Sequence, residues 1–370
     1  MLPRVAPYYA VKSNPDPTLL QILADNNAGF DCASLRELHE VRKLGWPSDN
    51  GPSDVVYAHP MKSARDIGAA GSMNIKTTVV DSLEECDKLS LCGWKGDAFL
   101  RVAVGDSGSK MPFSTKFGAS KNDVENIAKR STIPLSGVSF HVGSGCHDFI
   151  QYVQAIQYAS GPVFDILRKY GHQPTTLDIG GGFSAVYKDF SYAANAINTG
   201  LDGVPKNRRI IAEPGRYFAQ PCQDLFVKVI GKKRGVNGKG WRYFIDESLY
   251  GHFSCIPFDH QRPAWLRIPQ DPESYNSPLE ESIMFGRTCD SLDVIAKGMM
   301  EQMEVGDWLY FPLMGAYTSA TASEFNGFPK PYSVLDTDSL LPNIDDAADL
   351  VSDIHELKPL TYSNALPPII

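Results

Sequence analysis

Tyr8-Tyr9-Ala10-Val11-Lys12-Ser13-Asn14 is a short apolar run near the start of the chain that ends on a single lysine. Its two tyrosines and its β-branched valine predict a strand over Pro7–Val11. The prolines of Asn14-Pro15-Asp16-Pro17 predict a turn, after which apolar spacing predicts a helix. Lys12 is compatible with a solvated surface position. The alternative is the C-terminal end of a barrel strand, where burial and charged neighbours would lower its pKa.

Composition and charge exclude several classes of protein. With 43% hydrophobic and 21% charged residues among 370, the chain suits a soluble protein of two domains, or one large barrel with an addition. A net charge of −8 without a lysine or arginine run argues against a nucleic-acid partner. Seven irregularly spaced cysteines without a CxxC pair favour reduced thiols over disulfides or a zinc site. Since no signal peptide and no apolar run of membrane-spanning length occurs, we expect a cytoplasmic protein without a membrane partner.

Short β-rich runs alternate with helix-patterned segments over roughly 210 residues, which is the size of a (β/α)8 barrel. The predicted helices include Leu35–Leu44, Leu83–Leu89, Asp123–Lys129 and Phe149–Lys169. The alternative is a doubly wound open sheet with its chemistry at a switch point. Eight alternations favour the barrel, and the predicted strands are Pro7–Val11, Gly29–Cys32, Val55–Ala58, Thr77–Val80, Ala98–Val104, Leu135–Val142, Thr175–Ile179 and Arg209–Ala212.

The pattern changes after Phe218, where helical signals become sparse. We predict an α/β barrel domain over residues 1–218 and a mostly antiparallel β-sandwich or β-barrel domain over residues 219–335. Residues 336–370 form an acidic tail in which we expect a helix over Asp345–Leu357. The β-like runs of the second domain are Leu225–Ile230, Trp241–Ile245, Phe253–Pro257, Ser282–Phe285 and Trp308–Phe311.

Polar residues stand at the ends of most predicted barrel strands. Because the C-terminal ends of parallel barrel strands meet at one mouth, these side chains are predicted to converge there. A lysine, carboxylates, an imidazole and a glycine cluster at one mouth favour an enzyme site over a surface lysine. The residues are Lys12, Asp31, His59, Asp81, His141, Gly180-Gly181-Gly182 and Glu213.

The loops after the last two predicted strands suit a phosphate. They hold Gly180-Gly181-Gly182 and Gly215-Arg216, and adjacent glycines let backbone N–H groups approach a phosphate closely. Barrels commonly bind phosphate with these two loops, and the Ser144 hydroxyl can donate a further hydrogen bond. The alternative for the glycines is a tight turn. They lack the GxGxxG spacing, so they do not predict NAD.

Glu213 and His141 suit a planar cofactor. A carboxylate that faces a pyridine nitrogen keeps that nitrogen protonated, and a protonated pyridine is the electron sink of pyridoxal phosphate chemistry. An imidazole at the mouth can stack on such a ring, or act as an acid or base. The alternatives are a surface ion pair between Glu213 and Arg216, and a structural role for His141.

Cys289-Asp290 is a further candidate in the second half of the chain. Because a neighbouring carboxylate raises the pKa of a thiol, Cys289 suits a protonated thiol that donates a proton; a buried inert cysteine is the alternative. Phe258-Asp259-His260, with His252 and Cys255, contains metal-ligating residue types. Their spacing matches no zinc pattern, so we predict no metal site.

Several motifs, taken together, resemble those of a known family across nearly the whole chain. The family is the eukaryotic ornithine decarboxylases, which are pyridoxal-phosphate-dependent decarboxylases of basic amino acids with an alanine-racemase-like barrel. The motifs are Tyr8-Tyr9-Ala10-Val11-Lys12, Gly29-Phe30-Asp31-Cys32-Ala33-Ser34, Gly137–Cys146, Leu177–Phe183, Ala212–Tyr217, Thr288-Cys289-Asp290, Met314-Gly315-Ala316-Tyr317-Thr318 and Phe325-Asn326-Gly327-Phe328.

The resemblance implies roles around pyridoxal 5'-phosphate. Lys12 would hold the cofactor as a Schiff base, Glu213 would pair with the ring nitrogen, and His141 would stack on the ring. Asp31 and Glu37 match acidic positions beside the cofactor. The phosphate would be held by Ser144, Gly180, Gly181, Gly182, Gly215, Arg216 and Tyr317.

The resemblance also implies a substrate side. Asp259 and Asp290 would bind the distal ammonium of a small basic amino acid, in a region that also holds Phe258 and Tyr250. Cys289 would protonate the carbon that loses CO2, which makes it a catalytic residue together with Lys12 and His141. In this family the residues matching Cys289 and Asp290 reach the other subunit's site, which implies a homodimer with shared active sites.

The chain departs from the family pattern at several positions. Pro112 stands where an arginine near the cofactor is usual, and Phe258 replaces a tyrosine. Gly286-Arg287-Thr288-Cys289-Asp290-Ser291 replaces the usual Gly-Pro-Thr-Cys-Asp-Gly run, so Arg287 and Ser291 flank the expected proton donor. The family also has a segment before the lysine strand that contributes to the β domain, so we expect an open edge there.

Three functions are consistent with these residues. The first is decarboxylation of ornithine, or of a related diamino acid such as lysine, to a diamine of polyamine metabolism. The second is decarboxylation with oxidative deamination to an aminoaldehyde, if an altered Cys289 loop lets the carbanion meet oxygen. The third is a regulatory homologue that resembles antizyme inhibitors and binds a partner protein. One methylene contributes only about 1–3 kcal/mol in a pocket, so the sequence does not separate ornithine from lysine.

Overall fold

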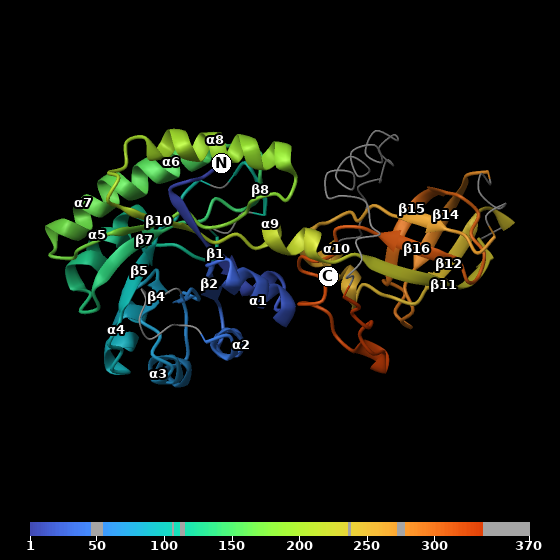
Figure 1. Ribbon diagram of the computed structural model, residues 1–370, viewed down its shortest axis with the longest axis horizontal. Coiled ribbons are helices and arrows are strands. Elements are labelled where there is room, and N and C mark those ends of the chain that lie inside the picture. Colours follow the sequence, from blue (N-terminus) through green and yellow to red (C-terminus); the bar gives the residue numbers. More distant parts are fainter. Residues whose placement is uncertain (46–54, 106, 112–114, 236–237, 272–277, 336–370) are drawn as a thin grey trace. The chain divides into compact units, whose positions relative to one another are not determined.

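A computed structural model describes residues 1–45, 55–105, 107–111, 115–235, 238–271 and 278–335. The chain divides into two compact units, Met1–Ala219 and a second unit that begins at Gln220 (Figure 1). Pro112 and the tail helix expected over Asp345–Leu357 lie outside the described residues.

The first unit contains a closed barrel of eight parallel strands, which confirms the predicted barrel and excludes the open sheet. The barrel closes at β1, where Val5 lies opposite Ile210 and Tyr8 lies opposite Gly29. Since the strands are parallel, their C-terminal ends lie at one mouth. Their order is β1 (Val5–Ala10), β10 (Arg209–Ala212), β9 (Thr176–Asp178), β7 (Leu135–Ser139), β5 (Asp97–Arg101), β4 (Thr77–Val80), β3 (Val55–Tyr57) and β2 (Gly29–Cys32).

The barrel strands are buried on both faces. Every residue of β2, β3 and β4 is buried, which explains why these strands do not alternate between apolar and exposed polar residues. Side chains from five strands form one buried cluster, made of Tyr8, Val56, Val79, Phe99 and Ile211. This cluster supports the strand ends that carry the polar residues.

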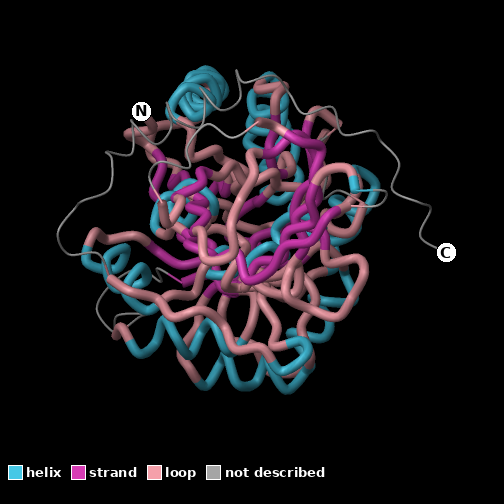
Figure 2. The backbone as a smooth tube through the Cα atoms, turned by 90° about the vertical axis from the view of Figure 1, so that its right-hand side faces the viewer, coloured by secondary structure: helices cyan, strands magenta, loops and turns pink. Residues whose placement is uncertain are grey.

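The helices of the first unit lie outside its strands (Figure 2). Four of them begin directly after a serine whose hydroxyl accepts a hydrogen bond from the third helical N–H, namely Ser34, Ser63, Ser82 and Ser120. These caps fix where the loops of the mouth end. The helices are α1 (Pro17–Asp25), α2 (Leu35–Lys43), α3 (Ala64–Ser72), α4 (Leu83–Leu91), α5 (Lys121–Arg130), α6 (Ile150–Tyr158), α7 (Phe164–Lys169), α8 (Tyr187–Leu201) and α9 (Arg216–Ala219).

Some element bounds differ from the prediction. The helix expected over Phe149–Lys169 is α6 and α7 separated by a π-helical turn around Pro162, whose nitrogen has no hydrogen to donate. The strands expected over Ala98–Val104 and Leu135–Val142 end earlier, as β5 and β7. The loops beyond them form a two-stranded ribbon that was not predicted, made of β6 (Ser109–Met111) and β8 (Ser144–Cys146).

The second unit is built on a six-stranded sheet that is antiparallel except between β12 and β14. Its buried core includes Tyr243, Phe253, Met284, Leu309 and Phe311. The strand order is β13 (Leu266–Ile268), β16 (Trp308–Phe311), β11 (Leu225–Arg234), β12 (Trp241–Ile245), β14 (Glu280–Phe285) and β15 (Val294–Met300).

One strand prediction in this unit is wrong. Phe253–Pro257 lies in a 3-10 turn, His252–Ser254, followed by the short helix α10 (Cys255–Asp259). Phe253, Ser254 and Cys255 are buried in succession, which a strand with one solvated face would not do. Pro257 is tolerated because it stands in the first turn of α10, where an N–H has no intrahelical acceptor.

Within the described residues, no helix is long and apolar enough to cross a membrane. In the same part of the chain, no group of three or more His, Cys, Asp or Glu side chains is placed to hold a metal ion.

Candidate active site

Lys12 lies at the barrel mouth, in a 3-10 turn directly after β1. Its Nζ lies 2.6 Å from Asp31 Oδ2, and Asp31 is fully buried while the Lys12 side chain is 46% exposed. The lysine therefore contacts a buried carboxylate at its inner side and stays open to a ligand at the mouth. Asp31 Oδ1 is buried without a hydrogen-bond partner among the described residues.

A second pair of carboxyl groups stands at the ends of β9 and β10. Asp178 Oδ1 accepts a hydrogen bond from the Gly180 N–H at 2.9 Å, and the Glu213 N–H donates to the Gly180 carbonyl at 2.7 Å. Burial raises the pKa of Asp178 to about 7. Burial, and then the charge of Asp178, raise the pKa of Glu213 well above its usual value. A cationic ring N–H facing Glu213 would offset this crowding of carboxyl groups.

His141 follows β7 and presents a neutral ring. Its Nδ1 accepts a hydrogen bond from the Gly143 N–H at 2.9 Å, so the proton of the neutral ring is assigned to Nε2. Burial, and then the charges of Arg101 and Lys12, lower the pKa of His141 well below its usual value. A neutral imidazole favours stacking on a planar group over proton donation at neutral pH.

Each of the three glycines after β9 packs so closely against a backbone carbonyl that it leaves no room for a side chain. A Cβ on Gly181 would lie 2.4 Å from the Glu213 carbonyl oxygen and 3.3 Å from His141 Nε2. Gly180 and Gly182 have φ values of +66° and +90°, which side-chain-bearing residues rarely adopt. The glycines therefore let the backbone run close to the His141 ring and to the Glu213 carbonyl. The lysine, the buried carboxyl groups and the neutral imidazole fit a pyridine aldehyde with a phosphate.

The remaining barrel residues of the prediction lie on neighbouring elements. Ser144 begins β8, and Arg216 begins α9. A Cβ on Gly215 would lie 3.1 Å from the Ser13 side chain, so this loop is close to the turn that carries Lys12. Glu37 Oε2 accepts a hydrogen bond from the Ala33 N–H at 2.6 Å, and burial raises the pKa of Glu37.

Two charged residues of the mouth, Arg101 and Asp178, were not among the predicted site residues. Arg101 ends β5, and its charge acts on His141, Asp178 and Glu213. Asp178 ends β9. Asp178 was overlooked because it lies inside a predicted strand, one residue before the end of that strand. Arg101 was overlooked because the fifth strand was predicted to continue past it.

In the second unit, residues 286–291 form a turn between β14 and β15, here called the 286–291 turn. The Tyr250 hydroxyl donates a hydrogen bond to Asp290, and the Leu292 N–H donates to the other oxygen of Asp290 at 2.9 Å. These two contacts, the Leu292 N–H first, lower the pKa of Asp290. Cys289 is exposed.

The other candidates of this unit lie on two separate segments. Phe258 and Asp259 lie on α10, where Phe258 is exposed and Asp259 accepts a hydrogen bond from Gln261. Tyr317 follows β16 and has a left-handed backbone, with a φ of +56°. Its carbonyl accepts a hydrogen bond from the Thr321 hydroxyl at 2.9 Å.

Comparison with known proteins assigns a family to this arrangement. Residues 1–220 match the family described as pyridoxal-dependent decarboxylase, pyridoxal binding domain. The chain is 39% identical to antizyme inhibitor 2 of Xenopus laevis over 347 residues, or 88% of this chain and 75% of that protein. It is also 39% identical to ornithine decarboxylase of Schizosaccharomyces pombe over 351 residues, or 92% of this chain and 80% of that protein.

A solved structure agrees with this assignment. The arginine decarboxylase of Paramecium bursaria Chlorella virus bound to agmatine is 34% identical to this chain, with a TM-score of 0.82. The match covers 89% of this chain and 88% of that one. The family model matches residues 1–220, and the ornithine and arginine decarboxylases match 92% and 89% of the chain, so the chain belongs to the pyridoxal-phosphate-dependent decarboxylases of ornithine, arginine and lysine.

Proposed function

We propose that the protein decarboxylates L-ornithine, or a closely related basic diamino acid, to a diamine. The observation that carries this proposal is the mouth of the barrel, where Lys12 and Asp31, the Asp178 and Glu213 carboxyl groups and neutral His141 lie together beside the glycine loop after β9. When bound there, pyridoxal phosphate supplies the protonated ring that accepts the electron pair left behind by CO2.

The mouth residues bind and orient. Lys12 would hold the cofactor through its aldehyde, and Asp31 would keep the lysine amine in place. Glu213 would keep the ring nitrogen protonated, and His141 would stack on the ring. The phosphate would be held by Ser144, Gly180, Gly181, Gly182, Gly215, Arg216 and Tyr317.

The second unit contributes the substrate side. Asp259 and Asp290 bind the distal ammonium of the substrate, since a charge-assisted hydrogen bond is stronger than a neutral one. Cys289 is exposed and donates a proton to the carbon that has lost CO2. We further propose a homodimer in which Cys289 and Asp290 serve the partner's barrel mouth.

The experiment is to purify the full chain with pyridoxal phosphate and incubate it with ornithine, lysine and arginine in separate reactions. CO2 release and mass spectrometry of the product then identify the substrate. A diamine from ornithine or lysine is the expected result. If the products are an aminoaldehyde and peroxide, the reaction is decarboxylation with oxidative deamination and not simple decarboxylation. If only arginine is turned over, the substrate is not a diamino acid.

A second candidate is supported by the similarity to antizyme inhibitor 2, namely binding of a partner protein without turnover. The same experiment separates the two candidates. A chain that binds pyridoxal phosphate through Lys12 and releases CO2 is an enzyme. Absence of CO2 from all three amino acids would favour the regulatory function.

A further inference from the structure

Two segments of the second unit hold the 286–291 turn. They are residues 247–252, which follow β12, and residues 325–329, which lie beyond β16. The rings of Tyr250 and Phe325 stack with centroids 4.2 Å apart and an interplanar angle of 27°, so the two holding segments also contact each other. The turn is therefore fixed between two segments that are themselves joined.

The Cys289 backbone is part of this contact. Its N–H donates a hydrogen bond to Asn326 Oδ1 at 3.0 Å, while the side chain of the next residue, Asp290, accepts one from Tyr250. Cys289 and Asp290 are thus both held by neighbours outside their own turn, Cys289 through its backbone N–H and Asp290 through its side chain.

Arg287 contacts both holding segments at once. Its backbone N–H donates to the Glu247 carbonyl at 3.1 Å. Its guanidinium donates to the Pro329 carbonyl at 2.8 Å and lies 4.8 Å from the centre of the Phe328 ring. A planar guanidinium can make such contacts together, because it presents several fixed donors and also stacks on aromatic faces.

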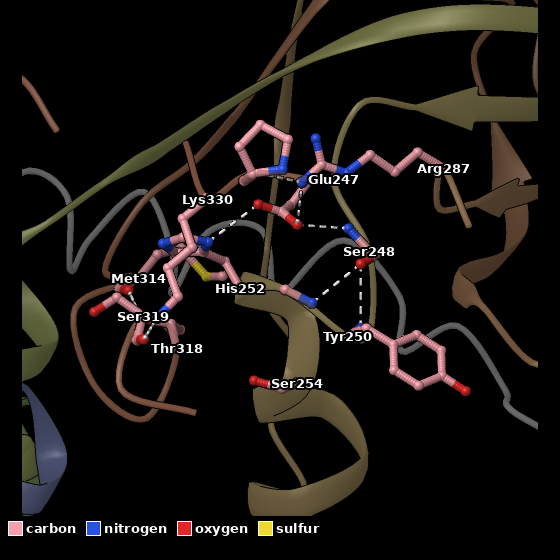
Figure 3. A network of polar contacts seen from close by, with 12 residues as sticks. Glu247, Ser248, Tyr250, His252, Ser254, Arg287, Met314, Thr318, Ser319 and Lys330 are labelled. Carbon is pink, nitrogen blue, oxygen red and sulfur yellow. Dashed lines mark hydrogen bonds and ion pairs between the residues drawn. The ribbon is translucent and has the colours of Figure 1, made fainter. Parts of the chain in front are cut away.

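Glu247 supplies the buried counter-charge. Its side chain is 1% exposed, and Oε1 lies 3.9 Å from the Arg287 guanidinium while Oε2 lies 3.0 Å from His252 Nδ1. Oε1 also accepts a hydrogen bond from the Ser248 N–H at 2.8 Å. Figure 3 shows Glu247 between Arg287 and His252. A buried carboxylate is unfavourable without partners, so its position and that of Arg287 depend on each other.

We propose that Arg287 is a positioning residue which sets the substrate-length selectivity of the site. Through Glu247 and the Pro329 carbonyl it fixes the 286–291 turn, and thereby the place of Asp290 at the distal ammonium and of Cys289 at the reacting carbon. The inference rests on the proposed function for the reaction, and on the contacts of Arg287 for the position of the turn.

The contacts of Arg287 with Glu247 and Pro329 are a feature of this chain's own sequence. The family that the chain resembles has a proline in place of Arg287, and a proline has neither an N–H to donate nor a charged group. The backbone contact with the Glu247 carbonyl therefore needs a residue other than proline, and the side-chain contacts with Glu247 and Pro329 need the guanidinium of Arg287. If the turn shifts, the distance between Asp290 and Cys289 on one side and the barrel mouth on the other changes, and with it the length of substrate that the site accepts. The ratio of activities on diamino acids of different length therefore reports the position of the turn.

The test measures kcat/KM for ornithine and for lysine with the holoenzyme, in the natural chain and in Arg287→Met and Arg287→Lys. The ratio of the two values is unaffected by the fraction of folded enzyme, so a loss of stability alone does not change it. We expect Arg287→Met to change the ratio about fivefold or more, since one methylene is discriminated by about 10- to 200-fold in a pocket. Arg287→Lys keeps the charge and should restore part of the ratio.

The matched control is Arg234→Met, which removes another arginine of the same unit whose guanidinium pairs with Glu280 at 2.9 Å. This variant should leave the ratio unchanged. Because Arg287→Met leaves Glu247 buried with one cationic partner fewer, the double variant Glu247→Gln with Arg287→Met is measured as well. It should show the same altered ratio with a more stable fold.

Hydrogen exchange of peptides that cover residues 286–291 and 325–329 gives a readout besides activity. We expect faster exchange in both peptides of Arg287→Met and no change in Arg234→Met. A ratio that stays within twofold in both Arg287→Met variants, with unchanged exchange, would overturn the inference. If the natural chain turns over no diamino acid, the proposed function fails, and the exchange data still decide whether Arg287 holds the turn.

Discussion

The barrel mouth and the 286–291 turn hold their reactive groups in different ways. At the mouth, Lys12 reaches a fully buried Asp31 at 2.6 Å, and both residues are placed by neighbouring strands of a closed barrel. In the turn, Cys289 is exposed, and Asp290 is held by the hydroxyl of a tyrosine from another segment. Backbone topology determines the first arrangement, and side-chain contacts determine the second.

This difference has consequences for mutation. A residue at a barrel strand end has little freedom, because a shift of one residue would turn its side chain to the other face of the sheet. A residue in the turn can move with its loop when a neighbour is lost. Substitutions at the mouth should therefore remove chemistry, whereas those around the turn should change geometry and selectivity.

The largest effect is expected for Lys12→Ala. The variant lacks the amine that holds the cofactor under the proposed function, and loss of a covalent catalytic group lowers kcat by on the order of 10³-fold or more. CO2 release measures the activity, and borohydride reduction followed by peptide mass spectrometry locates the attached cofactor. Lys43→Ala, which removes an exposed lysine of α2, is the control. A cofactor mass on any other lysine of the natural chain would contradict the assignment.

The next effect is a dependence of stability on pH in the cofactor-free protein. The pKa of Asp178 is raised from 3.8 to about 7 by burial, so the folded state retains a proton that the unfolded state releases. This contribution to the free energy of unfolding is fully present below pH 3.8 and is lost as pH rises through about 7. Asp178→Asn should flatten the decline between pH 4 and 7.

Urea unfolding at a series of pH values measures this decline. The exposed Asp25 on α1 provides the control, since Asp25→Asn should keep the slope of the natural chain. A natural chain whose stability rises between pH 4 and 7, relative to Asp178→Asn, would show that Asp178 is ionised in the folded state.

Two glycines distinguish backbone from side-chain placement. A Cβ at Gly181 meets the Glu213 carbonyl at 2.4 Å, and one at Gly251 meets Glu247 Oε1 at 1.9 Å. Either alanine should lower the free energy of unfolding by about 1–3 kcal/mol, because the interior must shift. Glu247→Ala should relieve the clash of Gly251→Ala, whereas the carbonyl in the way of Gly181→Ala cannot be removed by substitution.

Thermal unfolding of the single and double variants checks this comparison. Gly68 on α3 provides the control, because a Cβ there meets nothing within 4 Å. Gly68→Ala should be stabilising by about 0.5–1 kcal/mol. If Glu247→Ala restored the melting temperature of Gly181→Ala as much as that of Gly251→Ala, or restored neither, the two regions would not differ in the way proposed.

The barrel was predictable because its strands are short apolar runs between polar residues. The bounds of β2, β4 and β10 agree with the prediction residue for residue. The fifth and sixth predicted strands were too long because burial continues past the strand ends, where Val102 and Phe140 are 2% and 1% exposed in the mouth loops. Apolar patterns report burial, and burial does not stop where a ladder of hydrogen bonds ends.

The contacts around the turn were not predictable from a local pattern. Arg287 was visible as a departure from the family, but the carbonyl that it binds, Pro329, lies 42 residues further along the chain. Glu247 gave no signal at all, because nothing in its neighbours predicts that a glutamate there is buried. The residues at the barrel mouth can be predicted from the order of strands and helices in the sequence. Side-chain contacts between segments far apart in the sequence, such as that of Arg287 with Pro329, are seen only in the folded structure.

The smallest effect is expected for Tyr250→Phe, which tests how loosely the turn holds its carboxylate. The variant loses the hydroxyl that donates to Asp290 and keeps the ring that stacks on Phe325. Because the Leu292 N–H still donates to Asp290 at 2.9 Å, the pKa of Asp290 should rise only part of the way to its usual value.

Under the proposed function, KM for the diamino acid should therefore rise a few-fold while kcat changes little, since Asp290 binds the substrate and donates no proton. Tyr332→Phe, at a tyrosine that is 99% exposed, is the control. If Tyr250→Phe lowered kcat as strongly as Lys12→Ala, the turn would depend on one hydroxyl as strictly as the mouth depends on its lysine. The proposed difference, in which backbone topology places the mouth residues and side-chain contacts place the turn residues, would then be wrong at Tyr250, where it predicts the mildest effect of a substitution.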